Sequence, residues 1–386
     1  MNILVLGAGK VGLPIASALV DRQHGVWVVD TNAALVDGFV QGVNPIPCEP
    51  DGRISGISFS TNIPNTYPDV AYIIVPTPEE NGKLLSKYVI QARDEIRAHF
   101  KDLFIIVGST LDPADVPLVF TDSRMAYSPP LIRLGHVVQD FLEVSLRLVG
   151  IQSESDLSIM KSFYADSPLY RRSLAECRYI IGDPLSIAIA KLAINTSLSL
   201  KVAWANEVHS VVQALGADSR VVFETLHAEP RIQIGYSGWP PSGPCLPRDL
   251  EVWTSMASSP LIERAKIVHR AAVNKIIADT VRMISEIKNP RVAVLGVTYN
   301  PNAMDITNSQ GLAIANELFS NGCYVRIYDP AFGVVVPKAH RLVSLRASSA
   351  KEAIRDANVV IITTAWDEFK SLDYSGRFVI DLTRKV

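Results

Sequence analysis

The N-terminal stretch that decides the fold is Asn2-Ile3-Leu4-Val5-Leu6-Gly7-Ala8-Gly9-Lys10-Val11-Gly12. A short apolar run, typical of a buried strand, leads into a GxGxxG sequence and then into a helical pattern that continues to about Arg22. In this context Gly7 permits a tight turn, Gly9 lets backbone approach a pyrophosphate, and Gly12 lets the helix pack closely on the strand. Because the helix N-terminus also attracts phosphate, the stretch predicts a dinucleotide-binding unit.

A carboxylate ends the second apolar run, Val26–Asp30, 18 residues after Gly12. At that place Asp30 can accept hydrogen bonds from ribose hydroxyls and repel a 2′-phosphate, which favours NAD over NADP. Two plainer interpretations stay open. The glycines could form a tight strand–helix turn that binds nothing, and Asp30 could be a turn residue at a strand end.

The N-terminal part of the chain continues the alternation of strands and helices. Short, continuously apolar runs occur at Ala71–Pro76, Leu103–Val107 and Ser145–Gly150, and a helical pattern covers Tyr88–Phe100. Such runs predict a parallel sheet that is covered on both faces. The fold class expected for the chain is α/β, with two Rossmann-like doubly wound domains joined by a long central helix.

The central helix is expected from Asp183 to about Leu215, with Asp183 as N-cap, Pro184 in the first turn and Gly216 as C-cap. Its apolar faces are wide enough to pack against a second copy, so we expect a homodimer. A further helix is expected over about Pro260–Ile287.

After Asn289-Pro290 the alternation restarts. The three expected regions are therefore residues 1–182, 183–288 and 289–386. Strands of the third region are expected at Val292–Gly296, Tyr324–Tyr328, Val359–Thr363 and Phe378–Asp381, and its helices at Gly311–Ser320 and Ser349–Asp356.

The composition excludes several classes of protein. Of 386 residues, 48% are apolar and 20% charged, which argues against disorder, and a net charge of −2 gives no electrostatic case for nucleic acid or an anionic membrane. Four cysteines without Cys-x-x-Cys spacing predict no metal site and fit a reducing cytoplasm. The apolar N-terminus lacks the basic region of a signal peptide and is broken by glycines.

The second distinctive stretch is Gly243-Pro244-Cys245-Leu246-Pro247-Arg248-Asp249. A Gly/Pro-rich loop lets backbone come close to a substrate, and Arg248 would favour the thiolate of Cys245, which is the reactive form. Without further context a buried, inert cysteine is the favoured interpretation, and that interpretation is kept for Cys48, Cys177 and Cys323.

From end to end the chain resembles the UDP-glucose/GDP-mannose dehydrogenase family. Beyond the first glycine loop and the cysteine stretch, the resemblance rests on motifs in the family's order. They are Val75-Pro76-Thr77-Pro78, Gly108-Ser109-Thr110, Ala190-Lys191-Leu192-Ala193-Ile194-Asn195, Asn206-Glu207, Pro230-Arg231-Ile232, Leu295-Gly296 with Asp305, and Tyr328-Asp329-Pro330.

The resemblance implies the reaction. An NAD-dependent enzyme of polysaccharide biosynthesis would oxidise C6 of a nucleotide sugar, most often UDP-linked, twice to a carboxylate through a thioester on Cys245. Lys191 and Asn195, four residues apart on one helical face, would stabilise oxyanions and position the sugar. Asp249 and Thr110 would orient or activate water.

The resemblance also implies binding residues and domain roles. Residues 1–182 would bind NAD, 183–288 would form the dimer, and 289–386 would bind the nucleotide sugar. The expected cofactor-binding residues are Gly7, Gly9, Lys10, Val11, Gly12, Asp30, Thr77, Ser109, Thr110 and Arg248. The expected substrate-binding residues are Leu131, Arg133, Lys191, Asn195, Arg231, Tyr236 and Gly238.

The chain departs from the family where charged side chains are expected. The family's Asn/Ser-Pro-Glu-Phe-Leu-x-Glu-Gly segment is here Ser128-Pro129-Pro130-Leu131-Ile132-Arg133-Leu134-Gly135. Both glutamates are therefore lost, and Pro130 cannot act as an acid or base. The other three departures are Leu35, Asn300 and Thr307, which stand where the family has basic side chains.

Three hypotheses follow from these losses. The chain could be a full four-electron dehydrogenase in which Asp249, Thr110 and water perform hydrolysis. It could be an altered enzyme that releases an aldehyde or takes an unusual nucleotide sugar. It could also be a protein that binds NAD or a nucleotide sugar without catalysis, although such a protein would not need Cys245.

Overall fold

The computed structural model describes residues 1–44, 54–164, 177–234 and 241–383. The chain divides into two compact units, Met1–Ile194 and Asn195–Val386, and each is described by itself. The described residues form α/β architecture in both units, as the sequence predicts.

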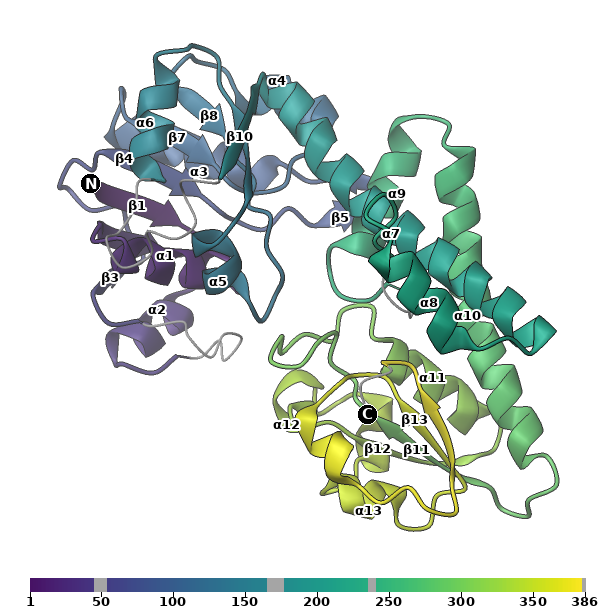
Figure 1. Ribbon diagram of the computed structural model, residues 1–386. Helices are drawn as coiled ribbons and strands as arrows, with labels where there is room; N and C mark the ends of the chain where they lie inside the picture. The colour runs from purple at the N-terminus through teal and green to yellow at the C-terminus, as the bar shows by residue number, and fades with distance from the viewer. Residues whose placement is uncertain (45–53, 165–176, 235–240, 384–386) are drawn as a thin grey trace. The chain divides into compact units, whose positions relative to one another are not determined.

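The first unit is built on an eight-stranded sheet in the order β10-β9-β8-β7-β4-β1-β2-β3 (Figure 1). Its strands are β1 (Asn2–Leu6), β2 (Gly25–Val29), β3 (Ile57–Ser60), β4 (Val70–Ile73), β7 (Phe104–Val107), β8 (Met125–Tyr127), β9 (Leu146–Gly150) and β10 (Arg178–Gly182). Every residue of β4, β7 and β8 is buried, which is why β4 and β7 read as continuous apolar runs. Strand order reverses between β1 and β4, and in such sheets ligands bind at that reversal.

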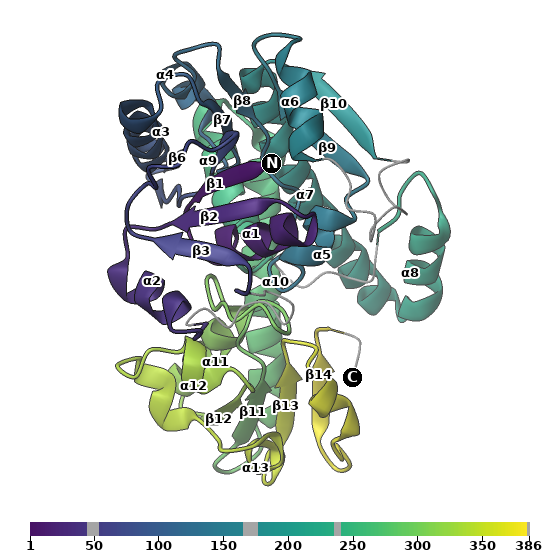
Figure 2. The same ribbon diagram turned by 90° about the vertical axis from the view of Figure 1, so that its left-hand side faces the viewer.

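The helices of this unit follow the strands in alternation. They are α1 (Gly12–Asp21), α2 (Ala33–Val40), α3 (Lys87–His99), α4 (Val116–Val119), α5 (Val137–Leu142) and α6 (Asp156–Phe163), with a small hairpin of β5 (Glu79–Glu80) and β6 (Lys83–Leu84). In Figure 2, β1, β2 and β3 lie side by side with α1 across them. One expectation was wrong in detail: the sheet is not wholly parallel, because β8 and β9 pair antiparallel at Tyr127 and Gly150.

The long helix α7 (Pro184–Leu215) has the predicted limits. Asp183 Oδ1 accepts a hydrogen bond from the Ser186 backbone N–H at 2.9 Å, and Gly216 ends the helix with φ +67°. By length and composition α7 could cross a membrane, a property that it shares with core helices of soluble proteins. The division between the two units falls inside α7.

The second unit joins helices to a smaller sheet. The helices α8 (Ser219–Ala228), α9 (Leu246–Met256) and α10 (Pro260–Ile284) precede a four-stranded sheet in the order β12-β11-β13-β14. Its strands are all parallel: β11 (Arg291–Leu295), β12 (Tyr324–Tyr328), β13 (Val359–Ile362) and β14 (Phe378–Asp381). The helices α11 (Gln310–Ser320), α12 (Phe332–Val335) and α13 (Ala350–Ile354) complete the unit (Figure 1).

Candidate active site

The glycine turn between β1 and α1 is shaped by close packing. Gly7 has φ +108°, and a Cβ there would lie 2.6 Å from the Ile74 carbonyl oxygen. A Cβ on Gly12 would lie 2.0 Å from the Gly7 carbonyl oxygen, so neither position admits a side chain. Around Gly9, by contrast, the described residues place no atom within 4 Å of an added Cβ. The turn therefore leaves open backbone at the glycine that a pyrophosphate would approach, and it fits a dinucleotide.

Asp30 lies directly after β2 and faces this turn. Its Oδ2 accepts a hydrogen bond from the Ala8 backbone N–H at 2.7 Å, and its Oδ1 accepts one from the Asn32 N–H at 2.9 Å. The carboxylate is only partly buried and has lone pairs left for ribose hydroxyls. Lys10 and Val11 are partly exposed at the start of α1.

Thr77, Ser109 and Thr110 follow the carboxyl ends of β4 and β7, which are neighbours in the sheet. Ser109 is buried and donates from Oγ to the Val75 carbonyl at 2.7 Å. Thr77 is also buried, and Thr110 is partly exposed. The fold therefore brings these predicted residues to the sheet edge that carries the glycine turn.

Tyr72 explains the glycine of the Gly108-Ser109-Thr110 motif. A Cβ on Gly108 would lie 2.2 Å from the Tyr72 hydroxyl oxygen, so only glycine fits over this ring. Burial raises the pKa of Tyr72 well above its usual value, and the phenol is neutral at physiological pH.

The segment after β8 lacks the two glutamates of the family pattern. Lys191 on α7 is 9% exposed, and its Nζ donates to the Pro130 backbone carbonyl at 3.2 Å. Leu131 packs against the apolar core of the unit, and Leu134 is buried. Arg133 extends toward solvent and pairs with Asp140 at 2.7 Å. The ammonium of Lys191 therefore contacts a main-chain oxygen where the family pattern has a carboxylate.

The cysteine stretch ends at a helix that the sequence analysis did not predict. Cys245 is the N-cap residue of α9, and its carbonyl accepts a hydrogen bond from the Asp249 N–H at 2.9 Å. Asp249 is fully buried. Its Oδ2 accepts from Asn195 Nδ2 at 2.6 Å, and its Oδ1 pairs with the Arg248 guanidinium at 2.8 Å. Asn195, Arg248 and Asp249 therefore form one polar group next to Cys245, in which Asn195 and Asp249 are buried and Arg248 is partly exposed.

The loop before Cys245 is held by the segment after β11. Gly243 has φ +80°, its N–H donates to the Thr307 carbonyl at 2.8 Å, and its carbonyl accepts from Asn308 Nδ2 at 3.0 Å. A Cβ on Gly243 would lie 2.8 Å from the Tyr299 ring. Sequence reasoning missed Asn308 and Tyr299 as positioning residues, because nothing in their local sequence points to a loop some sixty residues earlier.

None of these contacts involves the other predicted substrate-binding residues, Arg231, Tyr236 and Gly238. The Arg231 side chain is 86% exposed and pairs with Glu229 at 2.7 Å, an arrangement that raises its pKa through the Glu229 hydrogen bond. Tyr236 and Gly238 lie outside the described residues.

A glycine turn with a carboxylate at a topological switch point is typical of a dinucleotide-binding protein, and the cysteine beside the Asn–Asp–Arg group is a candidate catalytic centre. The chain matches three domains of the UDP-glucose/GDP-mannose dehydrogenase family: the NAD binding domain over residues 1–167, the central domain over 186–275 and the UDP binding domain over 293–385. The chain belongs to this family, and it is an NAD-dependent nucleotide-sugar dehydrogenase.

Individual relatives are distant but span the chain. A UDP-glucose 6-dehydrogenase of Rickettsia bellii is 25% identical over 97% of this chain and 91% of its own length. The UDP-glucose 6-dehydrogenase AglM of Haloferax volcanii is 26% identical over 100% and 97%. Among solved structures, a UDP-glucose dehydrogenase of Pyrobaculum islandicum superposes with a TM-score of 0.85 at 24% identity, covering 100% of this chain and 95% of its own. That likeness shows the fold.

Proposed function

We propose that this enzyme oxidises the C6 hydroxymethyl group of a UDP-linked hexose twice, to the uronate, through a thioester on Cys245. The observation that supports this best is the environment of Cys245. The residue lies at the start of α9, one turn before a fully buried Asp249 whose carboxylate is fixed by Asn195 and Arg248. A thiol beside such a group suits covalent capture of an aldehyde.

The proposed reaction consists of two oxidations and one hydrolysis. Oxidation of the alcohol to the aldehyde removes a hydride and a proton. The Cys245 thiolate then adds to the aldehyde carbon, and the oxygen takes up a proton to give a thiohemiacetal. Loss of a second hydride and of the hydroxyl proton gives the thioester. Water attacks that carbon, the C–S bond breaks, and the uronate and the thiolate are released. NAD, when bound, accepts a hydride in each oxidation.

The side chains have separate roles in this proposal. The Lys191 ammonium, buried and on one face of α7 with Asn195, stabilises the oxyanion at C6. Asn195 positions the sugar and holds Asp249, which orients water together with Thr110. Of the described residues, Leu131, Arg133 and Arg231 would contact the substrate. In the cofactor site, Asp30 would hold the adenosine ribose and the Gly7–Gly12 turn the pyrophosphate. Arg248 is a further proposed cofactor-binding residue.

One observation favours a second product. Pro130 contributes only a backbone carbonyl to Lys191, so no acid is present at the position where the family places a glutamate for the water step. If Asp249 and Thr110 do not replace it, the enzyme releases an aldehyde or acts on an unusual nucleotide sugar. UDP-glucose is the first candidate because the sequence relatives are named for it. UDP-N-acetylmannosamine is the second, since similar folds are named for it.

The ratio of NADH formed to sugar consumed tests the function, over a panel of UDP-, GDP- and TDP-sugars. Two NADH per sugar with an acid product is expected, together with a trapped thioester on Cys245 in mass spectrometry. One NADH with an aldehyde would favour the second product. Measurable NAD binding without NADH from any sugar would indicate a protein that binds without catalysis.

A Cys245→Ala variant tests the covalent step. It should lose acid formation, while Cys177→Ala, a partly buried cysteine outside the proposed site, serves as the matched control and should keep it. Acid formation by Cys245→Ala at the parent rate would contradict the thioester.

We also propose that the protein is a cytoplasmic homodimer that supplies uronates for polysaccharide biosynthesis. Exposed apolar side chains along α7 support the dimer, since exposed apolar surface commonly marks interfaces. These side chains are Leu185, Ile189, Leu198, Trp204, Val211 and Leu215. Sedimentation equilibrium should give a dimer, and Trp204→Asp should shift it toward the monomer. A parent protein that sediments as a monomer at micromolar concentration would contradict this.

A further inference from the structure

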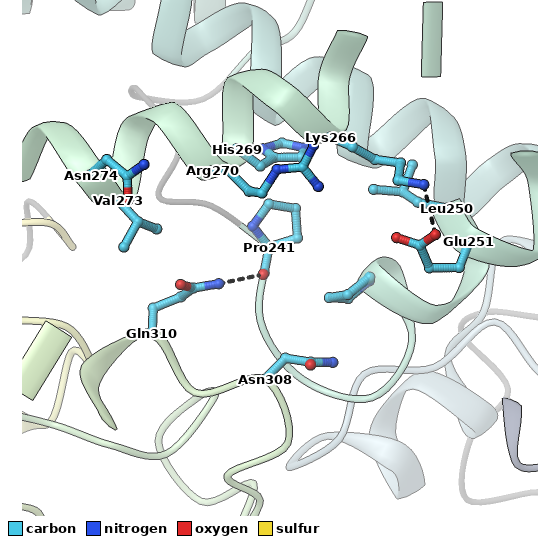
Figure 3. Close-up of a pocket in the computed structure, with 11 residues that line it drawn as sticks. Pro241, Leu250, Glu251, Lys266, His269, Arg270, Val273, Asn274, Asn308 and Gln310 are labelled. Atoms are coloured by element: carbon cyan, nitrogen blue, oxygen red, sulfur yellow. Dashed lines mark hydrogen bonds and ion pairs between the residues drawn. The ribbon is translucent and has the colours of Figure 1, made fainter. Parts of the chain in front are cut away.

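A cavity of about 350 Å³ lies beside the cysteine loop within the second unit (Figure 3). This volume is within the range of small-molecule sites. Its walls come from α9, from α10, from Pro241 in the loop before Cys245, and from Asn308 and Gln310. Of α9, the residues that line it are Pro247, Leu250 and Glu251, which share one helical face. Cys245 and Asp249 are not among the lining residues, so the cavity is distinct from the proposed catalytic centre.

His269 of α10 lines the cavity and is 8% exposed. Neither ring nitrogen has a hydrogen-bond partner of normal geometry among the described residues. Burial lowers the pKa of His269 to about 4, against a smaller opposite effect of the Ser199 backbone, so the imidazole is neutral at physiological pH. A neutral imidazole offers one donor and one acceptor, and buried polar groups normally have partners. Hydroxyl groups provide both.

The charge of the cavity comes from Arg270. Lys266 is already paired with Glu251 at 2.6 Å and Glu263 at 3.5 Å. Arg270 lines the same cavity and forms no ion pair with any described residue. A guanidinium in this position suits a carboxylate or a phosphate, which it can bind through two hydrogen bonds.

Two amides link the cavity wall to the cysteine loop. Gln310 Nε2 donates to the Pro241 carbonyl at 3.1 Å, and Asn308 Nδ2 donates to the Gly243 carbonyl at 3.0 Å. With both amide nitrogens engaged, each amide oxygen remains an acceptor. Acceptors of this kind complement hydroxyl donors.

We propose that this cavity is a second ligand site for a small anion that carries hydroxyl groups, of the class of sugar carboxylates and sugar phosphates. The anionic group pairs with Arg270, and hydroxyls fill the hydrogen-bonding capacity of His269 and the amide oxygens. The proposal goes beyond the proposed function, because it concerns binding away from Cys245 and requires no turnover.

Calorimetry on the full chain tests the proposal, with D-glucuronate, glucose 1-phosphate and glucose as probes. At least one of the two anions should bind, and whichever binds identifies the carboxylate or the phosphate as the recognised group. Glucose should bind more weakly. Arg270→Gln should weaken anion binding at least about tenfold, the usual effect of losing a charged hydrogen bond. Arg264→Gln, an exposed arginine of α10 outside the cavity, is the matched control and should bind as the parent does.

Three results would overturn the proposal: no binding of either anion to the parent, unchanged binding by Arg270→Gln, or loss of binding by Asn195→Ala with binding kept in Arg270→Gln. The last would assign the anion to the proposed catalytic centre. His269→Gln replaces the imidazole by another donor and acceptor. It should therefore lose less anion affinity than His269→Leu. These binding measurements do not use NADH. Their result can therefore be interpreted even if the proposed function is wrong.

Discussion

Both units contain a strand-to-helix turn with closely packed glycines, but the two turns differ in what the nearby carboxylate binds. After β1, Gly7 has φ +108° and a Cβ on Gly12 would meet its carbonyl oxygen at 2.0 Å; after β11, Gly296 has φ +99° and a Cβ on Gly311 would meet its carbonyl oxygen at 2.3 Å. A carboxylate also follows the second strand in each unit. Both turns therefore share the glycine packing of a Rossmann unit.

The difference lies in what the carboxylate binds. Asp30 is partly buried and accepts two backbone N–H groups. Asp329 is 1% exposed and accepts five donors, from the Val297, Thr298 and Ala331 backbones, the Thr298 hydroxyl and the Trp366 indole. Glycines with a strand-end carboxylate thus mark the fold, and they mark a cofactor site only where the carboxylate keeps capacity for a ligand.

The largest effect should come from Asp329→Ala. It would leave several buried donors without partners, and we expect the free energy of unfolding to fall by about 3–5 kcal/mol. Urea unfolding would measure the loss. A fall below about 1 kcal/mol would show that the Asp329 contacts are dispensable and that the two turns are more alike than described.

Glycine substitutions should separate the turns next. Gly311→Ala places a methyl group 2.3 Å from the Gly296 carbonyl oxygen, so we expect a loss of stability of about 2–4 kcal/mol. Gly9→Ala is the matched substitution in open space and should change stability by less than about 1 kcal/mol while weakening NAD binding. Thermal unfolding and NAD titration measure both. Equal thermal shifts for the two variants would contradict the distinction.

Asp30→Ala should act on binding more than on folding. Loss of charged hydrogen bonds to ribose should weaken NAD about 10- to 100-fold, with a stability change within about 1 kcal/mol. Fluorescence titration with NADH would show this. If the affinity for NADH stayed the same and the free energy of unfolding fell instead, Asp30 would be only a turn residue at the end of a strand.

The smallest effect is expected for Thr364→Val. Thr364 Oγ1 donates to the Thr298 carbonyl at 2.6 Å and closes the C-terminal turn with a single hydrogen bond. Its loss should cost about 1 kcal/mol in urea unfolding. A cost larger than that of Asp329→Ala would mean that the closure depends on this threonine more than on Asp329.

The fold could be predicted from the sequence because the patterns that mark its strands and helix ends are local. Buried runs such as β4 and β7, the cap at Asp183 and the stop at Gly216 are visible along the chain. The strands β3, β8 and β10 were missed, since β8 has only three residues and β3 and β10 are not fully buried.

Only part of the candidate active site could be predicted from the sequence. Helical spacing placed Lys191 and Asn195 on one face, but the bond from Asn195 to Asp249 joins residues 54 apart and depends on tertiary packing. The pairing of Arg133 with Asp140, and of Lys191 with the Pro130 carbonyl, had no sequence signal for the same reason. His269 likewise reads as an ordinary helix residue until its burial is known.

The position of the unit boundary inside α7 has an evolutionary consequence. Lys191 and Asn195 stand on opposite sides of that boundary but on one rigid helix, at a rise of about 6 Å. Inserting or deleting one residue between them would rotate one side chain by about 100° about the axis relative to the other. Lineages of this protein should therefore change length in its loops and tolerate substitutions in α7, while insertions and deletions between positions 191 and 195 are removed by selection.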